Sequence, residues 1–131
     1  MDPHRGRFPF GPQALGGDVL LLDTSEELLP ARNGGWIVRS LGERGILAAV
    51  DAVLVARPPV SDFTRRPTAE ERVRLRAEQC DVVIEVIGRY NPDAVVCVGI
   101  PFGHTRPQWI LPHGGGITVD GAARQVVADY S

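Results

Sequence analysis

The sequence predicts a small α/β domain with a buried mixed sheet, few helices and a short β meander at its C-terminal end. Three short apolar runs, at residues 18–23, 52–57 and 94–99, have the length and composition of buried strands. Segments with helical patterning separate these runs, and the last third of the chain alternates short apolar stretches with turn residues. The 131 residues are enough for one domain with a real core.

The N-terminal part predicts a lead-in followed by a strand and a helix. Residues 1–14 carry proline and glycine without periodicity, which indicates a linker remnant before a domain at residues 15–131. After the first strand, Thr24 and Glu27 have capping-box spacing, so a helical turn is expected to start there and to stop at Pro30.

The first full helix is predicted between Trp36 and Glu43, because residues 33–35 read as an interruption and Gly45 as a stop. One side of this helix is expected to carry Trp36, Ile37, Ser40 and Leu41. The second strand, residues 52–57, should end at the two prolines that follow it.

A long helix is the best-specified element of the sequence. Thr68 and Glu71 form a capping box after Pro67, and Gly88 is expected to supply the stop. Apolar residues at helical spacing predict one buried stripe, made of Val73, Ala77, Cys80, Ile84 and Ile87.

The C-terminal third predicts short strands at residues 109–112, 116–119 and 123–128. Asp120 and Gly121 lie between the last two, and this pair is typical of a type I′ hairpin turn.

Composition argues against several classes of function. The net charge of −2 gives no electrostatic basis for binding nucleic acid. Glutamates interleave with the arginines of residues 65–76, which favours a solvated helix face over a binding patch. No apolar stretch has the length of a membrane span and no signal peptide is visible, so a cytoplasmic location is expected. Cys80 and Cys97 lie in apolar surroundings and are interpreted as reduced thiols.

His104 is the strongest candidate for chemistry. It follows the third predicted strand within a loop bounded by residues 101–103 and Pro107, at the end of the strand where α/β folds place ligands. Asp23 occupies the matching place after the first strand. If the two strands are neighbours, the carboxylate can fix the tautomer of the imidazole. A structural role for each residue, in the loop and as a turn or capping carboxylate, stays open.

The other candidates are weaker. Ser25 lacks the G-x-S-x-G elbow that exposes a nucleophile, and the glycines at residues 114–116 precede a strand and not a helix, so they form no phosphate cradle. His113 would complete a metal site with Asp23 and His104 only in a spacing that matches no standard motif. His4 is interpreted as a surface histidine. No metal and no cofactor is expected.

Four blocks of the sequence together resemble the C-terminal half of LD-carboxypeptidases, a family that includes the microcin C resistance peptidases. The blocks are VLLLDTSEELLP, VRSLGERGIL, AVLVARP and GIPFGHTRPQWILPHGGGITVD, in the family's order, and the resemblance runs from about Leu15 to Asp120. The resemblance implies a swivelling β/β/α fold and a cytoplasmic serine peptidase with a serine, histidine and glutamate triad. In this family the substrates are amide bonds in peptidoglycan (murein) peptides or in peptidyl-nucleotide antibiotics.

The resemblance assigns the catalytic histidine to His104 and places Asp23 at the position of the glutamate. Two departures follow. Aspartate is one methylene shorter than glutamate, and the family's N-terminal domain with its serine is absent from these residues. The isolated chain is therefore expected to be inactive without a nucleophile domain or a separate subunit that supplies one.

Two other functions stay open beside the hydrolase. One is a non-catalytic binding or oligomerisation module that keeps the fold, which the aspartate and the missing serine elbow favour. The other is a metal-dependent enzyme built on Asp23, His104 and His113. Because the surface that faces the nucleophile domain in the family is bare here, we also expect a homo-oligomer with residues 102–109 near the contact.

Overall fold

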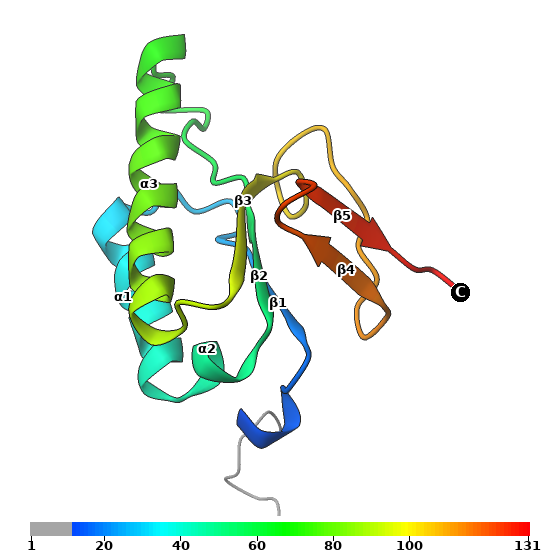
Figure 1. The fold of residues 1–131 in the computed structure, drawn as a ribbon. Coiled ribbons are helices and arrows are strands. Elements are labelled where there is room, and N and C mark those ends of the chain that lie inside the picture. The colour runs from blue at the N-terminus through cyan, green and yellow to red at the C-terminus, as the bar shows by residue number, and fades with distance from the viewer. Residues whose placement is uncertain (1–11) are drawn as a thin grey trace, which may run out of the picture.

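The computed structural model describes residues 12–131 and has three layers. A parallel sheet lies in the middle, the helices cover one of its faces, and an antiparallel hairpin covers the other (Figure 1). The expected α/β class is confirmed, with the parallel and antiparallel pairings divided between two sheets. Of the predicted lead-in, only the short 3-10 helix η1 (Pro12–Ala14) belongs to the described part, and His4 lies outside it.

The three predicted strands form the central sheet. They are β1 (Val19–Leu22), β2 (Ala52–Ala56) and β3 (Val95–Ile100), in the order β1-β2-β3. Leu20 pairs with Val53, and Val53 pairs with Val96. Because β2 is central and covered on both faces, it is the most buried strand, and Val53 and Leu54 are fully inaccessible.

Helix α1 (Ala31–Glu43) begins five residues earlier than the sequence predicts. Its glycines do not interrupt it, since Gly34, Gly35 and Gly42 lie on the buried face with Val38. The expected apolar side is wrong in part, because Trp36 is 63% exposed and Ile37 is exposed, while Leu41 packs against the core. The helix therefore packs through its glycines together with Val38 and Leu41, and Trp36 and Ile37 lie outside.

Close approach to helix α3 (Ala69–Tyr90) explains these glycines. A Cβ added at Gly35 would lie 2.7 Å from Val82 Cγ1, and one at Gly42 would lie 2.4 Å from the Tyr90 ring. No side chain fits between the two helices at these points. Short helix α2 (Ile46–Ala49) follows at Gly45, which has a positive φ of 76°. Thr24 and Glu27 form only a turn.

The capping box of α3 is confirmed. The Glu71 backbone N–H donates to Thr68 Oγ1 over 3.2 Å, and the Thr68 N–H donates to Glu71 Oε2 over 2.9 Å. The predicted apolar stripe is wrong in part, because Val73 is 68% exposed and the buried positions are Val83 and Ile87. Gly88 lies inside the helix and does not end it.

The C-terminal hairpin pairs β4 (Ile117–Asp120) with β5 (Gln125–Ala128). Its loop has four residues and not two, and the Ala123 N–H donates to Asp120 Oδ1 over 2.8 Å within it. The strand expected at residues 109–112 does not form. In the described part of the chain, no helix is both long and apolar enough to cross a membrane.

Candidate active site

Asp23 and His104 meet at the carboxyl end of the parallel sheet. Asp23 directly follows β1, and His104 lies in the loop after β3. His104 Nδ1 and Asp23 Oδ2 are 2.8 Å apart, so the expected approach of the two side chains is confirmed. The two strands are not neighbours, however, because β2 lies between them. The loop after β3 must therefore cross the end of β2 to reach Asp23.

Glycine makes this crossing possible. Gly103 has a φ of +81°, and a Cβ added there would lie 2.6 Å from Cγ of Asp23. The loop is anchored on both sides of this glycine: Phe102 is buried against Leu54 and Ala56, and the Gln108 side-chain amide donates to the Gly103 carbonyl. The sequence showed the glycine before His104 but gave no sign that it touches the carboxylate.

The imidazole of His104 keeps one nitrogen free for chemistry. Its side chain is 45% exposed, against 25% for Asp23. Among residues 12–131, Asp23 is its hydrogen-bond partner and Nε2 has none. A carboxylate beside Nδ1 favours the tautomer that carries the proton on Nδ1. Nε2 is then the basic nitrogen, and it is open to a group that approaches from outside the domain.

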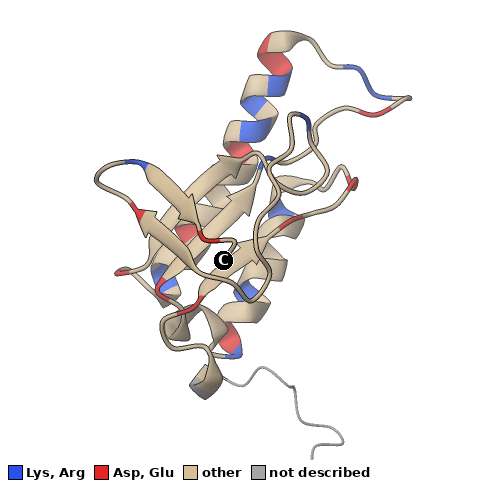
Figure 2. Cartoon of the chain, turned by 90° about the vertical axis from the view of Figure 1, so that its right-hand side faces the viewer, with Lys and Arg blue, Asp and Glu red and all other residues tan. Residues whose placement is uncertain are grey.

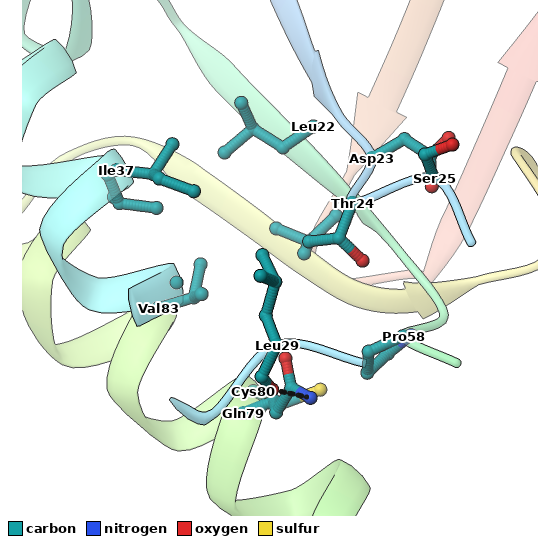
Figure 3. Close-up of a pocket in the computed structure, with 13 residues that line it drawn as sticks. Leu22, Asp23, Thr24, Ser25, Leu29, Ile37, Pro58, Gln79, Cys80 and Val83 are labelled. Atoms are coloured by element: carbon teal, nitrogen blue, oxygen red, sulfur yellow. Dashed lines mark hydrogen bonds between the residues drawn. The ribbon is translucent and has the colours of Figure 1, made fainter. Parts of the chain in front are cut away.

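An apolar cavity of about 300 Å³ opens beside the pair, between the two long helices and the ends of β1 and β2 (Figure 3). Apolar side chains form most of its wall: Leu22, Leu29, Ile37, Val38, Val55 and Val83. Gln79 crosses its far side and donates to the Leu29 carbonyl over 2.9 Å. Asp23 and Ser25 lie on the rim, with their polar atoms turned away from the apolar wall (Figure 3). Cys80 also lines the cavity, and burial raises the pKa of its thiol.

The other residues that the sequence analysis considered either lie away from Asp23 and His104 or lack the geometry of a known type of site. Ser25 is exposed in a turn with a positive φ of 58°. His113 lines a separate groove along β1, together with Pro112 and residues 114–116. In the part of the chain that the structure describes, no three His, Cys, Asp or Glu side chains are grouped as metal ligands. Cys80 and Cys97 are free thiols.

Comparison with known proteins gives the class to which this arrangement belongs. The family model described as the LD-carboxypeptidase C-terminal domain matches residues 6–119, so the chain belongs to that family. A crystal structure of an MccF-like protein from Streptococcus pneumoniae in complex with AMP has a similar fold, with a TM-score of 0.66 and 24% sequence identity. The match covers 94% of this chain and only 31% of that one. No curated protein sequence matches the chain.

Proposed function

We propose that this domain supplies the histidine and the acidic residue of a serine-type hydrolase site, with His104 as general base and Asp23 as its orienting carboxylate. The observation that carries the proposal is the 2.8 Å contact between His104 Nδ1 and Asp23 Oδ2 at an exposed edge of the sheet. Membership of the LD-carboxypeptidase C-terminal domain family supports it. The serine would come from a nucleophile domain, which these 131 residues do not include.

The roles follow from the geometry of the pair. Nε2 of His104 would accept the serine proton as the hydroxyl attacks the amide carbonyl, and would return it to the leaving amine. Asp23 would hold the ring and stabilise the imidazolium that forms between these steps. The oxyanion hole would belong to the nucleophile domain.

Asp23 can orient His104 although it is shorter than glutamate, because the loop that carries His104 lies close to the Asp23 carboxylate. Aspartate reaches less far than the family's glutamate by one methylene. Gly103 brings the backbone of the histidine loop against the Asp23 carboxylate, which a larger residue would prevent. We therefore infer that the loop and the acid are matched to each other.

The substrates that we propose are amide bonds in murein-type peptides or in peptidyl-nucleotides, hydrolysed in the cytoplasm. AMP in the MccF-like structure supports the nucleotide class. The second candidate is a binding module without catalysis, for which the apolar cavity beside Asp23 offers a place for a ligand.

Reconstitution tests the hydrolase. The chain is mixed with, or fused to, the nucleophile domain of an LD-carboxypeptidase, and hydrolysis of a peptide with an amide bond beside a D-residue is measured. Activity should require both parts and should vanish when the nucleophile serine is replaced by alanine. The chain alone should be inactive. Turnover by the chain alone that survives Ser25→Ala and is lost in His104→Ala would contradict the proposal, since it would reveal another nucleophile or an activated water.

A further inference from the structure

Three half-buried arginines gather near the end of β2, on the edge of the sheet that carries His104. Arg57 directly follows β2, and Arg72 and Arg76 are one turn apart on the same face of α3. Pro58, which follows Arg57, and Cys80, one turn after Arg76, line the same cavity. The two segments that carry these arginines are therefore close together. Figure 2 shows basic positions along the N-terminal half of α3 and on the loops beside it.

None of these arginines has a counter-charge in the described residues. Arg57 Nη1 donates to the Arg106 carbonyl over 3.3 Å, and Arg72 Nη1 donates to the Pro67 carbonyl over 3.4 Å. Nε of Arg76 is buried and has no hydrogen-bond partner among residues 12–131. By contrast, Arg74 on the solvent side of the same helix is paired with Glu78 over 2.6 Å.

The pKa of Arg76 reflects its burial and the positive charges of the other two arginines. Burial, followed by the charges of Arg57 and Arg72, lowers the pKa of its guanidinium, and only the Cys80 thiol acts in the opposite direction. Like charges that are partly desolvated repel each other more strongly than they do in water. Within residues 12–131, these three positive charges are therefore close together without a carboxylate paired to any of them.

We propose that Arg57, Arg72 and Arg76 form a binding site for an oxyanion, a phosphate or carboxylate group carried by a small ligand. Guanidinium groups present forked donors that match the oxygens of such groups, and an oxyanion supplies the missing counter-charge. The sequence pattern indicated that the arginines of residues 65–76 form a solvated helix face. The proposal gives two of them, Arg72 and Arg76, a binding role as well. Arg57 also holds the backbone of Arg106, two residues after His104, so the bound anion would lie near the histidine loop. Anion binding at this site does not depend on the hydrolase activity proposed above.

Thermal unfolding with inorganic phosphate or acetate, at constant ionic strength in a chloride buffer, tests the site. Saturating anion should raise the Tm of the wild-type domain by about 2–5 °C. Arg76→Met should be more stable than the wild type in chloride alone, because the repulsion is relieved, and should lose the saturable shift. Arg74→Met is the matched control, and it should keep the shift.

Binding measured directly by NMR titration keeps the test independent of stability. Arg57→Gln should weaken phosphate binding by about tenfold or more, which is the effect of losing one charged hydrogen bond. Saturation by phosphate alone would assign the site to a phosphate group, and competition by acetate would assign it to carboxylates as well. The proposal is overturned if neither anion gives a saturable response, or if Arg76→Met responds as the wild type does.

Discussion

At the scale of single residues, the contact between Asp23 and His104 depends on a third residue that has no side chain. Gly103 lies against the Asp23 carboxylate in a left-handed conformation that other residues adopt only at a cost. Asp23 and His104 were predictable from the sequence, because a polar residue directly after one buried strand and another in the loop after the next parallel strand lie at the same end of a sheet. The third was not, since a glycine in a loop carries no sequence signal for what it touches.

Gly103→Ala should break the Asp23–His104 contact, because the new methyl group would lie within 3 Å of the carboxylate. The imidazole Nδ1–H signal of His104 in NMR spectra should shift or disappear. In a reconstituted enzyme we expect kcat/KM to fall by about 100-fold.

Gly114→Ala is the matched control for this change. Gly114 also has a positive φ, of 75°, but nothing lies within 4 Å of a Cβ added there. Both variants should carry a similar backbone strain of about 1 kcal/mol. Only Gly103→Ala should change the His104 signal, and identical spectra from both variants would refute a role for this glycine.

The two thiols give a prediction about pH. Burial raises the pKa of Cys80 and of Cys97, and the charge of Asp81 adds to the effect at Cys80. Since only the thiolate reacts, both should react with a disulfide reagent more slowly near pH 8 than the same thiols in denaturant, and should speed up at higher pH than a free cysteine. The associated stability is complete below the pKa of the unfolded thiols and is lost as pH rises toward the folded values. Equal rates in the folded and unfolded chain would contradict this account.

At the scale of elements, the strands and the cap of the long helix were predictable and the helix faces were not. The side chains of Thr68 and Glu71 each accept a hydrogen bond from the other's backbone N–H, so this capping box can be predicted from the local sequence alone. The packing of α1 on α3 depends instead on Gly35 and Gly42, which have no side chain and so add nothing to the apolar pattern of the sequence. The buried positions of α3, Val83 and Ile87, lie in its C-terminal half, where α1 approaches it, and Val73 in the N-terminal half is exposed.

Gly42→Ala should destabilise the domain by about 1–3 kcal/mol, because the methyl group would overlap the Tyr90 ring and force the two helices apart. Gly88→Ala is the control on the partner helix. Gly88 is exposed with open space around it, so alanine should stabilise the helix by about 0.5–1 kcal/mol. Urea unfolding at constant m-value measures both changes. A neutral Gly42→Ala would show that the helices are not in close contact there.

At the scale of the whole molecule, the fold class followed from the alternation of strands and helices, but the strand order did not. A parallel sheet is assembled from contacts far apart in sequence, and nothing in residues 18–23 or 94–99 shows that β2 lies between them. The Asp23–His104 contact forms nevertheless, because the loop after β3 is long enough to span one strand.

Association is the first prediction at this scale. We expect a homodimer or larger assembly, with the loop after His104 near the contact. Phe102 is buried in its own domain, so Trp109 (49% exposed) and Ile110 (81% exposed) are the apolar residues available there. Light scattering at micromolar concentration should give a mass above 14.2 kDa that falls in Trp109→Ser/Ile110→Ser and stays high in Phe63→Ser. A monomer at every concentration would exclude this assembly.

The most direct test of the account as a whole compares two histidines in the reconstituted enzyme. His104→Gln should lower kcat by about 1000-fold or more with little change in KM, because the general base is lost while substrate binding is kept. His113→Gln, in an exposed position of the separate groove along β1, should leave kcat within about twofold. If His104→Gln is as active as His113→Gln, the Asp23–His104 pair is structural and the domain contributes no base to catalysis.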